Sequence, residues 1–179
     1  QNDTLTVNTN SIYDEDGIGS GGFSYQWTAD GVQIDGANAQ TLTLDQSLVG
    51  KSIAAEVSYT DSYGVMETIE SNPTAAVQNV NDPLTGSISI VGNLAKGQIV
   101  SINDNLSDED GLGDFSYRWF ADGQEIQGAT LKEYTLTDNE VGKTISAQIE
   151  YTDQEGTPES IQTTASSPVD SFFVDPNKI

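Results

Sequence analysis

The stretch FSYQWTADGVQIDGA (residues 23–37) returns later in the chain as FSYRWFADGQEIQGA (residues 115–129). In the first copy, Phe23, Tyr25 and Trp27 alternate with polar residues, and a period of two is typical of a half-buried β-strand. An Asp-Gly pair follows this strand at residues 30–31 and again at 122–123. Because Asp-Gly between apolar runs is a strong hairpin signal, we predict a tight β-hairpin in each copy.

The repeat continues well beyond the hairpin. TLTLDQSLVGKSIAAEVSYTDSYG (residues 41–64) matches EYTLTDNEVGKTISAQIEYTDQEG (residues 133–156). We therefore predict two domains, residues 1–81 and residues 82–179, joined near QNVNDPLT (residues 78–85). The second copy opens with GSISIVGNLAKG (residues 86–97), which has no counterpart in the first. We accordingly expect the first domain to be truncated at its N-terminus.

Alternation also marks the strand SIAAEVSY (residues 52–59), and no stretch has sustained helical spacing. The residues expected to face the core in the two copies are Ile53, Ala55, Val57 and Tyr59, and then Ile145, Ala147, Ile149 and Tyr151. About seven short strands in each copy predict an all-β fold of two tandem immunoglobulin-like β-sandwich domains. The strand tryptophan of each copy would pack on Ala55 or Ala147, where such domains usually carry a disulfide cysteine.

Composition excludes several classes of function. The chain has 28 acidic and 6 basic residues and a formal net charge of −22, which argues against nucleic-acid and anionic-membrane partners. It has no cysteine and no histidine, so it has no thiol nucleophile and lacks the commonest general base and zinc ligand. No apolar run is long enough to cross a membrane. Since no catalytic constellation is recognisable, we do not expect an enzyme, and we expect a monomer.

Acidic, glycine-rich loops are the candidate site. In an immunoglobulin-like sandwich, two loops and the entering chain share one end of the domain, and in the second copy these segments carry Asn81, Asp82, Asp108, Asp110 and Asp153. The first copy has Asp14, Asp16 and Asp61 at matching positions. Crowded carboxylates repel one another, and an oxygen-only ligand set favours Ca²⁺. The alternative is that these are solvated surface turns that bind nothing.

The segments LSDEDGLGDFSYRWFADGQEIQGA (residues 106–129) and YTLTDNEVGKTISAQIEYTD (residues 134–153), with the linker NVNDP (residues 79–83), closely resemble known repeats. They are similar to the immunoglobulin-like and cadherin-like tandem repeats of very large RTX-type surface adhesins of Gram-negative bacteria. The resemblance implies an extracellular location on the bacterial cell surface, with neighbouring repeats of the same polypeptide as partners. It also implies an interdomain Ca²⁺ shared by Asn81, Asp82, Asp108, Asp110 and Asp153.

We therefore expect a calcium-binding extender, or spacer, segment of an adhesin, in which other regions contact a host or abiotic surface, a glycan or a peptide. The alternative is a carbohydrate- or peptide-binding module of an adhesin or extracellular enzyme. Its contacts would come from aromatic residues expected to be exposed, namely Tyr63, Phe120, Phe172 and Phe173. A third possibility is calcium-dependent self-association of the kind seen in cadherins.

Overall fold

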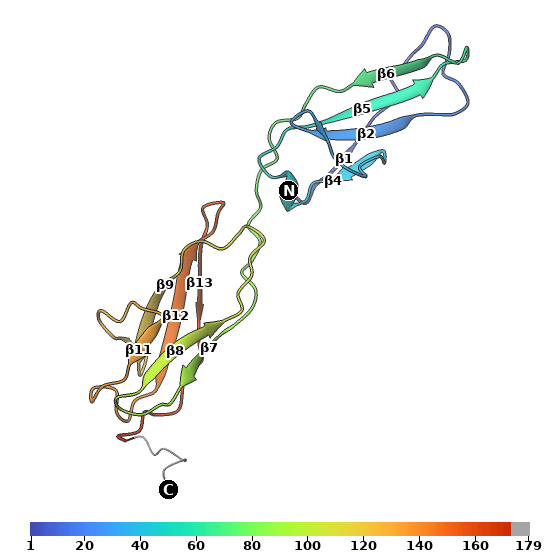
Figure 1. Cartoon of the computed structure of the whole chain (residues 1–179). Coiled ribbons are helices and arrows are strands. Elements are labelled where there is room, and N and C mark those ends of the chain that lie inside the picture. Colours follow the sequence, from blue (N-terminus) through green and yellow to red (C-terminus); the bar gives the residue numbers. More distant parts are fainter. Residues whose placement is uncertain (173–179) are drawn as a thin grey trace. The chain divides into compact units, whose positions relative to one another are not determined.

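The computed structural model describes residues 1–172, so Phe173 lies outside the described part of the chain. The chain forms two compact units, Gln1–Val80 and Asn81–Ile179. Both are built of β-strands, and the described residues contain one short 3₁₀ helix, η1 (Gln46–Leu48). Each unit is a two-sheet, immunoglobulin-like β-sandwich (Figure 1).

The first unit has a four-stranded and a two-stranded sheet. The four-stranded sheet has the order β3-β2-β5-β6, and the second sheet pairs β1 with β4. The strands are β1 (Thr4–Thr6), β2 (Ser24–Ala29), β3 (Val32–Gln33), β4 (Thr41–Thr43), β5 (Ile53–Thr60) and β6 (Met66–Glu70). All these pairings are antiparallel.

The second unit repeats this plan and adds a strand. Its sheets have the orders β10-β9-β12-β13 and β11-β8-β7. The strands are β7 (Ile88–Gly92), β8 (Ile99–Asp104), β9 (Ser116–Ala121), β10 (Gln124–Glu125), β11 (Glu133–Thr135), β12 (Ile145–Thr152) and β13 (Pro158–Gln162). β8 pairs with both β7 and β11, whereas its counterpart β1 pairs with β4 alone among the described strands.

The core of each unit forms around a tryptophan. Trp27 lies opposite Ala55 in the register of β2 and β5, and Trp119 lies opposite Ala147 in the register of β9 and β12. All four residues are buried, so an alanine indeed takes the place beside each tryptophan. Each indole N–H donates to a backbone carbonyl 2.9 Å away, which satisfies the one polar atom of the buried ring.

The predicted hairpins are confirmed. Asp30 and Gly31 connect β2 to β3 with φ angles of 48° and 78°, and Asp122 and Gly123 connect β9 to β10 with 46° and 77°. Two successive residues with positive φ define the turn that matches the right-handed twist of paired strands. Asp30 Oδ1 also accepts a hydrogen bond from the Ser52 backbone N–H at 2.9 Å, which ties this turn to the start of β5.

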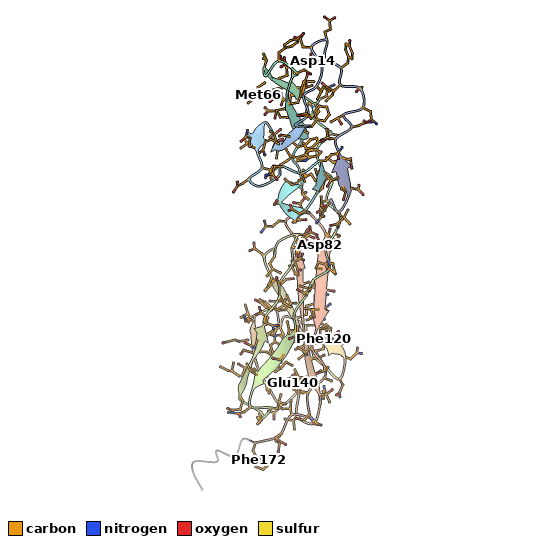
Figure 2. All side chains as sticks on the ribbon, turned by 90° about the vertical axis from the view of Figure 1, so that its right-hand side faces the viewer. Asp14, Met66, Asp82, Phe120, Glu140 and Phe172 are labelled. Carbon is orange, nitrogen blue, oxygen red and sulfur yellow. The ribbon has the colours of Figure 1, made fainter. Side chains whose placement is uncertain are left out.

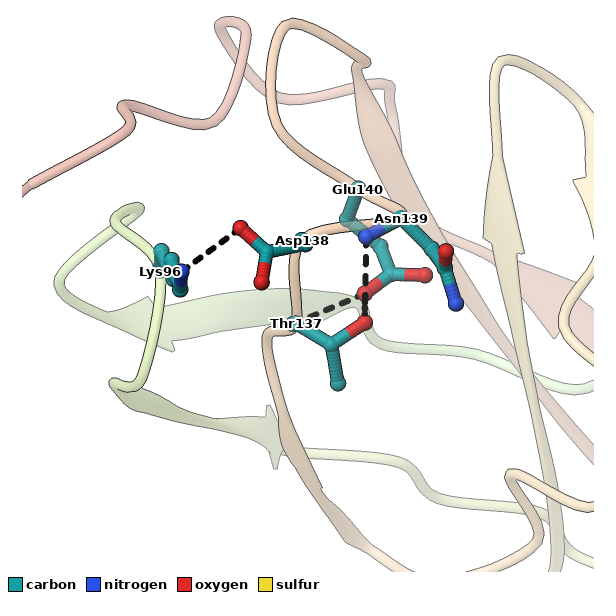
Figure 3. Close-up of polar contacts among 5 residues, drawn as sticks. All are labelled: Lys96, Thr137, Asp138, Asn139 and Glu140. Carbon is teal, nitrogen blue, oxygen red and sulfur yellow. Dashed lines mark hydrogen bonds and ion pairs between the residues drawn. The ribbon is translucent and has the colours of Figure 1, made fainter.

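A buried carboxylate lies in the connection between β11 and β12. Glu140 accepts hydrogen bonds from the Thr137 backbone N–H at 2.8 Å and from the Thr137 hydroxyl at 2.7 Å, and Asp138 forms an ion pair with Lys96 at 2.6 Å (Figure 3). The Glu140 carboxylate thus reaches back to the backbone N–H three residues earlier and stabilises the turn, as the Glu of a capping box does at the N-terminus of a helix. Glu140 and Asp82 lie near opposite ends of the second unit (Figure 2), so Glu140 has a structural role there.

Two of the aromatic residues that we expected to be exposed, Tyr63 and Phe172, are exposed in the structure. Phe120 is only partly exposed, which corrects the expectation. It lies on β9 between Glu125 of β10 and Ser146 of β12, and neighbouring strands on both sides cover part of the ring.

Candidate metal centre

The candidate site lies at the end of the second unit where the chain enters it. Three segments meet there: the entering segment (residues 81–85), the loop before β9 (residues 105–115) and the turn between β12 and β13 (residues 153–157). Thr85 and Ser107 exchange two backbone hydrogen bonds of 2.9 and 3.1 Å, which join the entering segment to the loop. The Gln154 N–H donates to the Asp110 carbonyl at 3.2 Å, which joins the loop to the turn.

Three carboxylates converge at this end. Asp108, Asp153 and Glu159 each offer an oxygen, and the three oxygens lie within 4.8 Å of one another. Two full charges about 5 Å apart repel each other by about 3 kcal/mol at an effective dielectric constant of about 20. A divalent cation among the three oxygens would replace this repulsion with attraction.

Asp153 supplies a second, independent indication of a ligand. Its side chain is only 5 % exposed, and its Oδ1 accepts hydrogen bonds from the backbone N–H groups of Glu155 at 2.9 Å and Thr157 at 2.7 Å. Its other oxygen, Oδ2, is buried and has no hydrogen-bond partner. Leaving a buried charged acceptor unpaired costs about 1–3 kcal/mol or more, so this oxygen fits a metal ligand.

Asp108 is held in place from two sides. Its Oδ1 accepts a hydrogen bond from the Asp110 backbone N–H at 3.0 Å, and its Oδ2 accepts one from the Tyr151 hydroxyl at 2.5 Å. Burial, together with this hydrogen bond to Asp108, raises the pKa of Tyr151 above its usual range. Because each carboxylate oxygen has about two acceptor sites, Asp108 keeps capacity to bind an ion.

The entering segment is attached directly to these acidic residues. Asp110 is buried, and its Oδ2 accepts a hydrogen bond from the Asp82 backbone N–H at 2.7 Å. The Asn81 side-chain amide donates to Glu159 Oε1 at 3.1 Å. The structure therefore brings all five predicted residues of the second copy to one end, and we call Asp108, Asp110, Asp153 and Glu159 the acidic rim.

Glu159 is the residue that sequence reasoning missed. It lies opposite Tyr151 in the register of β12 and β13, and Glu67 lies opposite Tyr59 in the first unit. An acidic residue at the start of the last strand in both copies was the available signal. Glu159 was missed because it lies in a strand and not in one of the acidic loops.

The first unit has the same scaffold around its own tyrosine. Asp14 accepts hydrogen bonds from the Asp16 N–H at 2.8 Å and from the Tyr59 hydroxyl at 2.9 Å. This hydrogen bond, with a smaller effect of burial, raises the pKa of Tyr59 to about 12. Asp61 is buried and accepts backbone hydrogen bonds from Tyr63 at 2.8 Å and Val65 at 2.7 Å, as Asp153 does in its turn.

The carboxylates of the first unit nevertheless do not converge as those of the second unit do. Among residues 1–172, Asp108, Asp153 and Glu159 form the only such group of three carboxylates. Asp16 and Glu67 are exposed, whereas their counterparts Asp110 and Glu159 are buried and half-buried. The structure thus does not gather Asp14, Asp16 and Asp61 into a comparable group.

Glycine allows each loop to approach its neighbouring strand. A Cβ at Gly113 would overlap the Thr152 carbonyl oxygen, and a Cβ at Gly19 would lie 2.6 Å from the Thr60 carbonyl oxygen. Contacts this short do not occur for real side chains, so a larger residue would push the loop away from the turn. The Gly-rich composition of the loops therefore serves the geometry of this end in both units.

No family model matches the chain. Over 122 residues the chain is 28 % identical to the "Highly immunogenic outer capsid protein" of Enterobacteria phage T4, and the match covers 66 % of the chain. The match covers 32 % of that protein, so it spans about a third of the relative's length.

Among solved structures, the tandem Ig repeats of Dlar match with 11 % identity and a TM-score of 0.28, over 81 % of this chain and 80 % of that one. A TM-score this low adds nothing to the fold assignment, which rests on the strand order and register of each unit.

Proposed function

We propose that the chain is a calcium-binding spacer segment of a large extracellular adhesin on the bacterial surface, in which Ca²⁺ at the acidic rim stiffens the join between repeats. The observation that carries the proposal is the buried, unpaired Oδ2 of Asp153 beside two further carboxylates. The resemblance of the repeats to those of RTX-type adhesins supports the extracellular role.

The ligand chemistry supports Ca²⁺ over other ions. The rim offers carboxylate oxygens without nitrogen or sulfur, which favours a hard cation. Ca²⁺ accepts six to eight oxygens at roughly 2.3–2.6 Å in irregular geometry, and water can complete the shell. Mg²⁺ requires a near-octahedral shell at shorter distances, which ligands from three separate segments satisfy less readily.

The hydrogen bonds of the rim suggest how an ion would act on the chain. Asn81 contacts Glu159, and Asp82 contacts Asp110, so an ion held by the rim would fix the residues that immediately follow the first unit. Without an ion, repulsion among the carboxylates would loosen the same contacts. Binding to the folded state alone adds about 2.7 kcal/mol of stability at a hundredfold excess of ligand over Kd.

The capsid relative supports exposure on the outside of a large assembly. The name of that protein places it on an outer capsid. We propose a cell surface for this chain, with a virus particle as the second candidate location. Within residues 1–172 no helix has the length and apolar character needed to span a membrane. We propose a non-enzymatic role, because the rim offers acceptor oxygens without a nucleophile–base pair.

Isothermal titration calorimetry of the full chain with CaCl₂ tests the proposal. We expect one tight site, lost in Asp153→Asn and Glu159→Gln and retained in the matched first-unit variant Glu67→Gln. No heat of binding at millimolar Ca²⁺, or equal binding by Asp153→Asn, would overturn the metal site.

Stiffening needs a separate measurement. Because the chain has no cysteine, the double variant Asp35→Cys/Lys143→Cys would carry spin labels at these two positions only, one in each unit. We expect double electron–electron resonance to give a narrower distribution of the distance between the two labels with Ca²⁺ than with EDTA. An unchanged distribution in a protein that binds Ca²⁺ would reject the spacer mechanism while leaving the site intact.

A further inference from the structure

The end of the first unit that corresponds to the acidic rim has a different surface. We call residues 13–18 and 61–66 the loop tip; Asp14 and Met66 mark it in Figure 2. Its two segments are joined by the Ser62 N–H, which donates to the Gly17 carbonyl at 2.9 Å, and by a β-bridge between Ile18 and Asp61. The loop tip is thus one continuous surface.

Large apolar side chains are exposed there. Tyr13 is 82 % exposed, Tyr63 81 %, Met66 74 % and Val65 54 %. Single exposed apolar residues are ordinary, but three of these four lie within one segment, residues 61–66, and the fourth lies in the loop bonded to that segment. Such a gathering on a small domain marks an interaction surface. Tyrosine is also enriched at the centres of protein interfaces.

The fold itself does not require these residues. The turn bond from Asp61 N–H to the Val65 carbonyl, 2.8 Å, recurs in the second unit from Asp153 N–H to the Thr157 carbonyl, 2.9 Å. The second unit builds the same turn without tyrosine, valine or methionine at these positions. In place of Tyr13, Tyr63, Val65 and Met66 it has Ser107, Glu155, Thr157 and Pro158.

Charge restricts the kind of partner. Asp14, Glu15 and Asp16 lie in the loop tip, and Lys51 is the only lysine or arginine among residues 1–80. Lys51 lies just before β5, whereas residues 61–66 of the loop tip follow the other end of that strand, so the length of β5 separates this lysine from the surface. A second copy of a chain with a net charge of −22 would be repelled.

We propose that the loop tip is a docking surface for a cationic polypeptide segment of another protein that also carries apolar side chains. Arginine or lysine would stack on Tyr13 and Tyr63 and pair with the neighbouring carboxylates. Apolar side chains of the partner would cover Val65 and Met66. This role is separate from calcium binding at the acidic rim of the second unit.

The probe is a fluorescein-labelled peptide of alternating arginine and leucine, titrated against the full chain in EDTA and followed by fluorescence anisotropy. Two matched peptides replace every arginine by glutamine or every leucine by glycine. We expect saturable binding of the first peptide and at least roughly tenfold weaker binding of the other two. In NMR spectra of the chain, the amide shifts should concentrate in the loop tip.

The double variant Tyr13→Ser/Tyr63→Ser should weaken binding roughly tenfold. The control Val32→Ser/Leu131→Ser removes two comparably exposed apolar side chains elsewhere and should leave binding unchanged. The proposal is wrong if the tyrosine variant and the control variant bind the arginine–leucine peptide equally well. It is also wrong if the glutamine peptide binds as tightly as the arginine–leucine peptide. A dimer in sedimentation velocity that the tyrosine variant dissociates would instead assign the surface to a second copy and also overturn it.

Discussion

Glu159 lies directly opposite Tyr151 across β12 and β13, and the Tyr151 hydroxyl donates to Asp108. One tyrosine therefore lies beside two of the three carboxylates that converge at the acidic rim. Tyr59 has the corresponding neighbours Glu67 and Asp14 in the first unit. A change at one of these sites therefore has a natural control at the equivalent position in the other unit.

Calcium should stabilise the second unit selectively. Each unit has one tryptophan, so Trp27→Phe leaves Trp119 as a reporter of the second unit and Trp119→Phe leaves Trp27 as a reporter of the first. We expect millimolar Ca²⁺ to raise the Tm seen by Trp119 fluorescence by roughly 10 °C over EDTA, and the Tm seen by Trp27 by much less. Equal shifts would contradict a site confined to the second unit.

Alkaline pH should destabilise both units through their buried tyrosines. The pKa of Tyr59 is raised to about 12 and that of Tyr151 is also raised, whereas an unfolded tyrosine titrates near pH 10. The folded state therefore retains protons that the unfolded state has lost, and stability falls as pH rises from about 10 towards 12. Urea unfolding at pH 9, 10 and 11 should show a smaller loss in Tyr59→Phe; an identical slope in that variant would refute this origin.

Gly113→Ala should destabilise the second unit by roughly 1–3 kcal/mol, because the added methyl group overlaps the Thr152 carbonyl oxygen. It should also weaken Ca²⁺ binding by moving the loop that carries Asp108. The control is Gly21→Ala, where a Cβ meets nothing within 4 Å. Urea unfolding and calorimetry measure the two effects, and a neutral Gly113→Ala would show that the loop can relax.

Glu140→Ala should lower stability without changing Ca²⁺ affinity. The substitution leaves the Thr137 N–H and hydroxyl without their acceptor, which costs roughly 1–3 kcal/mol. In the first unit, Asp45→Ala removes the cap of η1 and should cost about 1 kcal/mol. A change in Ca²⁺ affinity in Glu140→Ala would contradict the separation of the two ends.

Much of the fold followed from short-range sequence patterns. Alternation around Trp27 and the Asp-Gly pairs correctly predicted strands and hairpins, because both depend on local geometry. Phe120 was misjudged, since coverage by neighbouring strands depends on the sheet and cannot be read from its own segment.

The site was predicted less completely. The loops of the second unit do bring Asp108 and Asp153 together, but the pattern of acidic residues did not reveal Glu159. Asp110 is buried and accepts a hydrogen bond from the backbone of Asp82, and its own loop sequence does not encode this contact with another segment. Identical motifs thus produced different surroundings in the two units, and Ca²⁺ binding itself stays a prediction.

Backbone N–H groups already fix Asp108 and Asp153, through hydrogen bonds from Asp110, Glu155 and Thr157 that involve no ion. A cation arriving at this end would meet a preorganised cage, so little of its binding energy would be spent on ordering loops. If the acidic rim binds Ca²⁺ as proposed, the polypeptide would fold before it meets the ion, and the repulsion among the rim carboxylates would be relieved only afterwards, where Ca²⁺ is abundant.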